Sequence, residues 1–506
     1  MISNSKQIKF GAILSYLSIA LSVVAGLLYT PWMVEKIGQS HYGLYTLANS
    51  IITLFLVDFG LSSTTSRYLA KYNAEGKREE AERFLGAVYK LYLIVDTVIF
   101  TILLVYFFMI DSIYVGMTAR ELEEFKIVYV ISALFSVVNF PFVTFNGILN
   151  AYEKFIPLRL ADLLYRVFNV GFTVIALLLG YGLYALVSVH AIVGLSVVLF
   201  KFIVIKRTVP LKVRFTKTDK SIYKEIFSFS IWVTVTSLAQ RMIFNITPTV
   251  LGVVATTTAI AVFGIITTIE GYTYTFTSAI NGMFMPKISR IVTKNDAEKD
   301  LNPLLISVGK FQYASNGLII AGFAGLGQSF INLWMGPGYE DAYLGILLVL
   351  VPGIFYNSLQ IANTTMIVQK KVKTKAIIML ITGVINIALA FPLAKLYGVI
   401  GACMSICIAY VFRAIACNVV YHKVLPVNIP KFMSKCYLRM SIPVVLTILA
   451  GVGLNFLLKD GGWLMFVAKA AIVSVIYLAL VLVLGLSKGE RNRVLSFVIR
   501  KGKRGK

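Results

Sequence analysis

The sequence has few charged residues for its length. Only 14 % of its 506 residues are Asp, Glu, Lys or Arg, whereas 58 % are hydrophobic. A soluble globular protein of this size needs more polar surface than that composition supplies. Apolar runs of about 20 residues, each long enough to cross a bilayer, recur along almost the whole chain. The composition therefore predicts an all-α, polytopic membrane protein.

Cysteine and histidine are also scarce, with four and three residues respectively. Cys403 and Cys407 lie one helical turn apart, but no histidine or carboxylate beside them completes a metal site. The histidines, His41, His190 and His422, are scattered along the chain. We expect no metal, no cofactor and no catalytic residues, and the protein is not expected to be an enzyme.

Acidic residues are half as frequent as basic ones, 23 against 48, which gives a net charge of +25. A nucleic-acid-binding protein would carry such charge on a soluble basic domain or a recognisable module, and neither is present. The distribution of the charge indicates membrane topology instead. We place fourteen spans, at residues 9–34, 42–65, 86–109, 125–149, 157–179, 183–205, 226–250, 257–284, 305–333, 342–367, 374–394, 398–421, 437–458 and 463–486.

With the N-terminus inside, the inner segments and the span ends that adjoin them hold 39 Lys and Arg residues, and the outer segments and their adjoining span ends hold 5. An asymmetry of this kind is the positive-inside rule, and a wrong number of spans would scramble it. Both termini are therefore predicted to be cytoplasmic, in a multi-pass membrane protein. The basic tail at residues 487–506 is explained by topology and by attraction to anionic lipid.

Two parts of the chain share a pattern at an offset of 217 residues. Thr30-Pro31 recurs as Thr247-Pro248, and Asn169 falls on Asn386. We therefore predict two pseudo-symmetric six-helix lobes, followed by two additional helices and the tail. Since six is even, both lobes enter the membrane from the same side, and a site between such lobes suits alternating access. The predicted domains are residues 1–210, 222–425, 436–486 and 487–506.

The stretch Tyr42–Ala70 carries Asp58 within an otherwise apolar span. A carboxylate at membrane depth is costly unless it is paired, hydrated or enclosed in a bundle, so it is usually functional. The alternative is that Asp58 lies close to the cytoplasmic interface and is simply hydrated.

Several spans carry polar residues at helical spacing. Asp162 and Arg166, one turn apart, either line a site or form a structural ion pair. Arg241 and Glu270 lie more than two turns from either interface, and we expect them to face a hydrated cavity between the lobes. The side chains of Lys469 and Arg413 are expected to reach the nearer interface. The stripes comprise Asp162, Tyr165, Arg166 and Asn169; Ser237, Arg241, Asn245 and Pro248; Glu270, Tyr274, Ser278 and Asn281; and Asn357, Gln360 and Thr364.

Taken together, these features resemble Wzx-type polysaccharide and O-antigen flippases of the multidrug/oligosaccharidyl-lipid/polysaccharide exporter superfamily. The resemblance lies in the opening GAILSYLSIALSVVAGLLYTPWMVEKIGQSHYGLYTLANSI, in VDFGLSSTTSRYLA, in the loop LNAYEKF and in the six-plus-six duplication. It covers roughly residues 8–425. The basic cluster expected in the first span of the lipid II flippase branch is absent, which argues against lipid II as cargo.

The resemblance implies a flippase that moves an undecaprenyl-diphosphate-linked oligosaccharide to the outer leaflet for surface polysaccharide synthesis. Its partners would be the lipid-linked cargo, membrane lipids and a polysaccharide polymerase complex. H⁺ or Na⁺ is the possible coupling ion, and a buried carboxylate can exchange protons. The candidate cargo ligands are Arg241, Arg166, Asn245, Tyr274, Asn281, Asn357 and Gln360, and the candidate ion carriers are Asp58, Glu270 and Asp162.

Two other functions are compatible with the pattern. A cation-coupled exporter of small drug-like compounds would share the fold, and a mainly anionic cavity would favour it. A membrane polymerase or ligase acting on lipid-linked sugars would need a sizeable outer loop with catalytic Arg or His, and the outer loops here are short.

Overall fold

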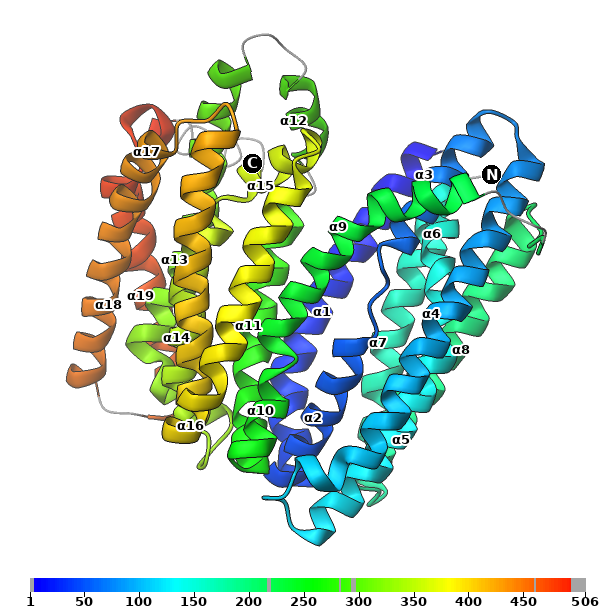
Figure 1. The fold of residues 1–506 in the computed structure, drawn as a ribbon. Coiled ribbons are helices and arrows are strands. Elements are labelled where there is room, and N and C mark those ends of the chain that lie inside the picture. Colours follow the sequence, from blue (N-terminus) through cyan, green and yellow to red (C-terminus); the bar gives the residue numbers. More distant parts are fainter. Residues whose placement is uncertain (1–3, 216–219, 282–283, 293–296, 459–460, 493–506) are drawn as a thin grey trace, which may run out of the picture. The chain divides into compact units, whose positions relative to one another are not determined.

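A computed structural model describes the chain except at residues 1–3, 216–219, 282–283, 293–296, 459–460 and 493–506 (Figure 1). The described residues are helical and include no β-strand. They form two compact units. Unit 1 comprises residues 1–264 and 379–399, and unit 2 comprises residues 265–378 and 400–506.

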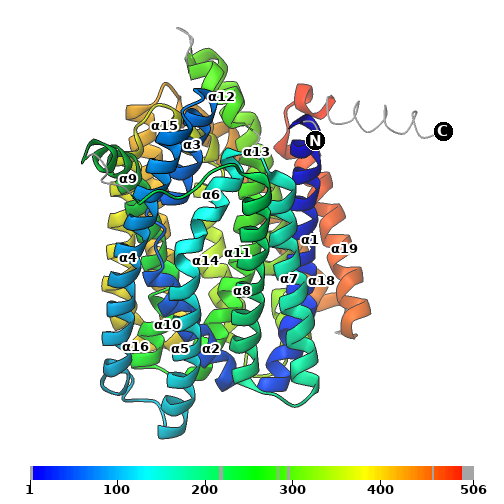
Figure 2. The ribbon, with the colours of Figure 1, turned by 90° about the vertical axis from the view of Figure 1, so that its right-hand side faces the viewer.

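Unit 1 is a bundle in which α7 and α8 pack together, as do α5 and α8, and α1 and α7 (Figure 2). A capping box formed by Thr118 and Glu121 starts α5, satisfying two backbone N–H groups at the helix start. The helices of this part of the chain are α1 Asn4–Ile37, α2 Gln39–Phe55, α3 Leu61–Ala74, α4 Arg78–Ile113, α5 Ala119–Asn139, η1 Phe140–Val143, α6 Thr144–Ala151, α7 Phe155–Leu178, α8 Leu183–Thr208, α9 Lys220–Phe244 and α10 Thr247–Val254.

Unit 2 is built around α13, against which α14, α18 and α19 pack. Gly325 of α13 and Gly451 of α18 lie so close that a Cβ on Gly325 would fall 2.9 Å from the Cα of Gly451. The helices are α11 Thr257–Asn281, α12 Met285–Val292, α13 Ala297–Trp334, α14 Asp341–Asn357, α15 Gln360–Val368, α16 Val372–Val424, α17 Ile429–Phe432, η2 Met433–Leu438, α18 Arg439–Leu457, α19 Gly462–Leu480 and η3 Val481–Gly485, of which α11 and α16 also contribute residues to unit 1.

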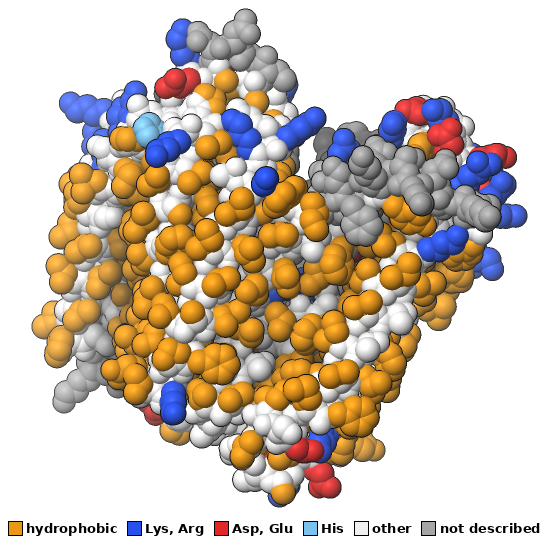
Figure 3. All heavy atoms as spheres, in the orientation of Figure 1, with side chains coloured by type: hydrophobic (Ala, Val, Ile, Leu, Met, Phe, Trp, Pro, Cys, Tyr) orange, Lys and Arg blue, Asp and Glu red, His pale blue; other side chains and the backbone are white. Residues whose placement is uncertain are grey.

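Membrane insertion is evident in the helices themselves. Among the described residues, eight helical segments are long and apolar enough to cross a membrane, and a ninth results if α14 and α15 count as one span bent by 53°. Hydrophobic side chains cover the middle of the face shown in Figure 3, and charged side chains gather toward the ends of the helices. The protein is therefore a multi-pass membrane protein. The number fourteen and the lobe boundaries stay predictions.

The second predicted span, residues 42–65, is not one continuous helix. It is broken between α2 and α3, and Asp58 lies in the break. Phe59 and Gly60 adopt positive φ angles of 49° and 65°. The left-handed conformation is favourable for glycine, which has no Cβ to clash with the backbone.

The seventh predicted span, residues 226–250, is also broken. The chain leaves the helix at Asn245 and Ile246, between α9 and α10, and Pro248 lies in the first turn of α10. Proline has no N–H to donate and clashes with a preceding helical carbonyl, so it is favoured at a helix start. By contrast, α1 continues through Pro31. The same Thr-Pro pair thus lies in an intact helix in one copy and at a break in the other.

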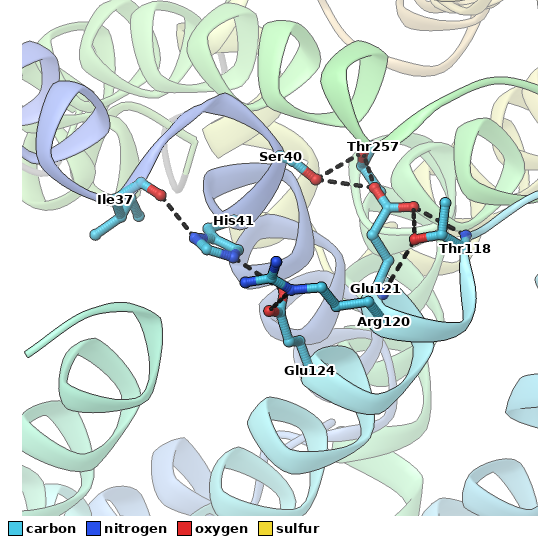
Figure 4. A network of polar contacts seen from close by, with 8 residues as sticks. All are labelled: Ile37, Ser40, His41, Thr118, Arg120, Glu121, Glu124 and Thr257. Carbon is cyan, nitrogen blue, oxygen red and sulfur yellow. Dashed lines mark hydrogen bonds and ion pairs between the residues drawn. The ribbon is translucent and has the colours of Figure 1, made fainter.

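A polar network connects three turns at the predicted outer end of unit 1 (Figure 4). Glu121 Oε1 accepts hydrogen bonds from Thr257 at 2.7 Å and from Ser40 at 2.9 Å. The hydroxyls of Ser40 and Thr257 lie 3.0 Å apart, and these residues are 217 positions apart in the chain. Equivalent residues of two copies contact each other only near the symmetry axis, so the duplication would bring this pair together. Only glycine fits at Gly43, where a Cβ would fall 2.1 Å from the Thr257 carbonyl oxygen.

Candidate functional site

Unit 1 contains a polar cavity of about 470 Å³. Four residues of α7 line it, at the spacing that places them on one helix face. Gly194 of α8 has no side chain, which leaves room for the ring of Phe135 from α5. The polar residues that line the cavity are Ser18, Asn139, Asn146, Arg159, Asp162, Tyr165, Arg166, His190 and Lys201.

The cavity contains three cations, Arg159, Arg166 and Lys201, against one carboxylate, Asp162. Asp162 lies 3.4 Å from Arg159 and 3.6 Å from Lys201. The Lys201 ammonium also donates a hydrogen bond of 3.0 Å to Asn146. The ion pairs of Asp162 are therefore with these two residues, and not with Arg166 as one interpretation of the sequence proposed.

Arg166 makes no hydrogen bond or ion pair with another described residue, although its side chain lines the cavity. Its guanidinium group therefore has donors that no described residue occupies. A guanidinium is planar and binds two oxygens of a phosphate or carboxylate at once. Because the cations outnumber the carboxylate, the cavity favours an anion.

Aromatic and hydroxyl groups form another part of the wall. The Tyr165 hydroxyl lies 2.8 Å from Nδ1 of His190. The ring of His190 meets the rings of Tyr165 and Phe135 edge to face. Such a surface offers both ring faces and hydrogen-bonding groups, which are the contacts that a sugar can use.

A second charged cluster in unit 1 lies at the break between α2 and α3. Asp58 Oδ1 accepts a hydrogen bond from the buried Tyr92 hydroxyl, and Oδ2 accepts one of 3.3 Å from the backbone N–H of Ser62. Arg241 of α9 interacts electrostatically with Asp58. Its Nη1 is buried and has no hydrogen-bond partner among the described residues. Asp58 is thus partly buried and hydrogen-bonded by Tyr92 and by the backbone of Ser62.

Unit 2 contains two buried cations, Arg413 and Lys469, whose side chains were expected to reach the membrane interface. Arg413 is only 3 % exposed, and its guanidinium carbon lies 4.1 Å and 3.7 Å from the ring centres of Tyr356 and Tyr410. Glu270 interacts electrostatically with it. Lys469 is also buried, at 1 % exposure, and donates a hydrogen bond to Asn455. The prediction that both side chains reach the membrane interface is wrong, because each turns into the bundle.

The other predicted cargo ligands do not lie together, and three of them lie at or beside breaks between helices. Asn245 lies between α9 and α10, and Asn357 and Gln360 flank the bend between α14 and α15. Tyr274 is half-exposed. The side chain of Asn281 lies outside the described residues. The structure therefore brings Arg166 and Asp162 to one cavity and Asp58 and Arg241 to another cluster.

Sequence reasoning missed Arg159, Lys201 and His190 as members of the cavity. Arg159 was detectable, since it extends the Asp162 stripe by one turn toward the N-terminus. Lys201 and His190 lie on α8 and had no such signal, because their position depends on how α7 and α8 pack. Within the described parts of the chain, no group of three or more His, Cys, Asp or Glu residues is placed to hold a metal ion.

A model of the polysaccharide biosynthesis protein family matches residues 9–292, more than half of the chain. The chain belongs to the polysaccharide biosynthesis protein family. It is 22 % identical to the uncharacterized membrane protein EpsK of Bacillus subtilis (strain 168), with 94 % of this chain and 95 % of that protein covered. It is 23 % identical to a putative O-antigen transporter of Escherichia coli (strain K12), over 77 % of this chain and 92 % of that protein.

Solved structures show the fold of this family member. The lipid II flippase MurJ in an inward closed conformation has a TM-score of 0.73 at 17 % identity, covering 94 % of this chain and 98 % of that one. An inward-facing multidrug resistance MATE transporter of the MOP superfamily has a TM-score of 0.61 at 15 % identity, covering 84 % and 99 %. The chain thus shares the fold of these two proteins, and the family match confirms the resemblance to polysaccharide biosynthesis proteins seen in the sequence.

Proposed function

We propose that the protein is an alternating-access flippase of the bacterial plasma membrane. It moves an undecaprenyl-diphosphate-linked oligosaccharide from the inner to the outer leaflet for biosynthesis of a surface polysaccharide. Family membership and the flippase-like fold support the transport class. The observation that carries the proposal is the cavity of unit 1, in which Arg166 has uncommitted donors beside Arg159 and Lys201.

The diphosphate is the part of this cargo that needs a cation, because a phosphate loses its hydration on entering a protein cavity. Arg166 binds the phosphate oxygens through its fork of N–H groups. The amides of Asn139 and Asn146 and the rings of Tyr165 and His190 then contact the first sugars. In this scheme the remaining predicted ligands, Arg241, Asn245, Tyr274, Asn281, Asn357 and Gln360, contact the cargo at other stages of transport.

Coupling to H⁺ or Na⁺ requires a carboxylate whose charge changes or is shared during transport. Asp58, Glu270 and Asp162 each interact with a cation of the protein. A coupling ion that binds such a carboxylate competes with that cation and releases it. Ion binding at Asp162 would thus free Arg159 and Lys201 for the cargo diphosphate.

A cation-coupled exporter of small compounds is the second candidate, favoured by the similarity to MATE transporters. Such cargo is usually cationic, and a cavity with three basic side chains and one carboxylate would repel it. The charge of the cavity therefore favours the flippase.

The test is the leaflet distribution of lipid-linked repeat units in cells that carry single variants. In cells with Arg166→Ala, repeat units should accumulate on the inner leaflet and transport should fall by roughly 30- to 100-fold, within the range for the loss of one hydrogen bond to a charged group. Arg166→Lys keeps the charge without the fork, so it should retain part of the activity. Arg207→Ala removes an exposed cation of α8 outside the cavity and is the control. Full transport in Arg166→Ala would remove the cavity from the mechanism.

A further inference from the structure

Unit 2 has a basic cavity of about 410 Å³ at the end where α13, α17, η2 and the segment after η3 meet. Its side chains include four cations and one carboxylate. These are Lys310, Lys431, Lys435, Arg439 and Glu490. The charge distribution of the sequence predicts that this end faces the cytoplasm. None of these residues belongs to the cavity of unit 1.

One of the four cations is already neutralised. Lys310 is 5 % exposed, and its ammonium lies 3.0 Å and 2.7 Å from the two carboxylate oxygens of Glu490. Burial raises the pKa of Glu490, but hydrogen bonds from Lys310 and Ser487 outweigh it and lower the pKa to about 2. Glu490 is therefore ionised at neutral pH, and the pair fixes the segment after η3 against α13.

The other three cations have charge to offer a ligand. Lys431 and Lys435 are exposed, and no described residue forms an ion pair with either. Arg439 donates from Nε and from one terminal nitrogen to the carbonyls of Leu484 and Leu486, at 2.9 and 2.8 Å. These contacts hold the guanidinium in place and leave donors on its other terminal nitrogen.

The three cations lie on the same run of helix. Lys435 belongs to η2, a π-helical turn that joins α17 to α18, and Lys431 and Arg439 lie four residues before and after it. Single π-helical turns inside α-helices are frequent at functional sites. The arrangement concentrates positive charge on one side of the helix start.

Exposed apolar side chains adjoin the cations. Met433, Leu438 and Ile442 are 45 %, 69 % and 48 % exposed. Figure 3 shows Lys and Arg side chains gathered at the end of unit 2 where Figure 1 places α17, above a surface covered by hydrophobic side chains. A free phosphate or an acidic peptide needs no such apolar border, whereas a phospholipid needs both a cation for its phosphate and an apolar surface for its acyl chains.

We infer that this cavity binds the phosphate of an anionic phospholipid of the inner leaflet, with Lys431, Lys435 and Arg439 as its ligands. The acyl chains then lie along the exposed apolar side chains of η2 and α18. The bound lipid stabilises the contacts by which Arg439 of α18 holds Leu484 of η3 and the following Leu486. This inference does not depend on the proposed function.

The experiment measures lipid binding to the full-length protein, purified in detergent, by native mass spectrometry. Phosphatidylglycerol, phosphatidylethanolamine and inorganic phosphate are the three probes. The wild type should bind phosphatidylglycerol, and Lys431→Ala/Lys435→Ala should bind it roughly 10- to 30-fold more weakly, as expected for two basic residues at a membrane surface. Phosphatidylethanolamine should bind weakly to both proteins.

Two control variants distinguish a site from general surface charge. Lys431→Arg/Lys435→Arg keeps the charge and should bind phosphatidylglycerol within about twofold of the wild type. Lys206→Ala/Arg207→Ala removes two exposed cations of unit 1. It should also bind phosphatidylglycerol within about twofold of the wild type. Equal affinity of the wild type and Lys431→Ala/Lys435→Ala would overturn the inference. The inference would also be overturned if inorganic phosphate bound as tightly as phosphatidylglycerol. The same holds if Lys206→Ala/Arg207→Ala weakened phosphatidylglycerol binding as much as Lys431→Ala/Lys435→Ala.

Discussion

The first two spans of each predicted copy make an informative comparison. In the first copy, the opening helix α1 is intact and the following span is broken at Asp58, between α2 and α3. In the second copy the opening span is broken after Arg241, between α9 and α10, and the following helix α11 runs unbroken. At the 217-residue offset, Asp58 corresponds to Thr275 and Arg241 to Val24.

The two predicted copies therefore follow the same order of spans. Their breaks lie in different spans, and the charged residues near these breaks have opposite signs. Within unit 1, the carboxylate at one break interacts with the cation near the other. A helix break frees backbone groups and opens space beside them, which is tolerated at membrane depth where a cavity or protein surrounds it. Under the predicted duplication, each copy would therefore have acquired its own break and its own charged residue.

The largest effect is expected from breaking this pair. Arg241→Ala leaves Asp58 without the cation that interacts with it electrostatically. Transport of lipid-linked repeat units should be lost, whereas Arg241→Lys should only weaken it. The measurement is the leaflet distribution of repeat units in cells.

Removing both charges sharpens the same test. Asp58→Asn/Arg241→Gln has no unpaired charge, so its thermal unfolding temperature should return close to that of the wild type. Transport should stay low if the pair acts in the mechanism. Recovery of transport together with stability would show that the pair is only structural.

The next effect concerns the turns that open the second span of each copy. Glu121 accepts hydrogen bonds from Ser40 of the first turn and Thr257 of the second. Glu121→Gln keeps the size but loses the charge, and should lower the free energy of unfolding by about 1.5–3 kcal/mol. Thermal unfolding in detergent measures this. Glu123→Gln, on the exposed side of the same helix turn, should change it little.

A smaller effect is expected at the break itself. Gly60 has a φ angle of 65°, so Gly60→Ala should cost about 1–2 kcal/mol. Gly271 lies in the unbroken helix α11 with no atom within 4 Å of an added Cβ. Gly271→Ala should therefore be neutral or stabilising by up to about 1 kcal/mol. If Gly60→Ala and Gly271→Ala changed the unfolding temperature equally, this would contradict the conclusion that one span is broken and the other continuous.

A further effect is expected at the pair formed by Lys310, in the second predicted copy, and Glu490, beyond it. Hydrogen bonds lower the pKa of Glu490 to about 2 despite its burial, against about 4.3 in an unfolded chain. A lowered pKa means that the stabilisation is full above about pH 4.3 and is lost as the pH falls toward 2. The difference in unfolding temperature between wild type and Glu490→Gln should be constant from pH 7 to about 5 and shrink below. The same series with Glu298→Gln should show no such change.

The sequence predicted the helical membrane class and the family, because composition and charge asymmetry are averaged over the whole chain. It also predicted a charged stripe at Asp162 and Arg166, since helical spacing alone places them on one face. It did not predict the partners of Asp162, because Arg159 and Lys201 reach it only when α7 and α8 pack.

The sequence also did not predict the direction in which charged side chains of the spans point. Arg413 and Lys469 were expected at the interface, but each turns into the bundle, Arg413 between two tyrosine rings. Hydropathy shows that a residue lies in a span and says little about whether its side chain faces lipid or protein. The break at Asp58 was missed for a related reason, because hydropathy averaged over a whole span does not register a turn of a few residues.

The proposed function is tested most directly by transport with purified components. The protein is reconstituted in liposomes that carry an undecaprenyl-diphosphate-linked oligosaccharide in one leaflet, and the sugar exposed on the opposite leaflet is measured over time. Wild type should transfer the lipid between leaflets, and Arg166→Ala should be slower by roughly 30- to 100-fold. Equal transfer by both proteins, or no transfer of this lipid alongside export of a cationic dye, would contradict the proposed function.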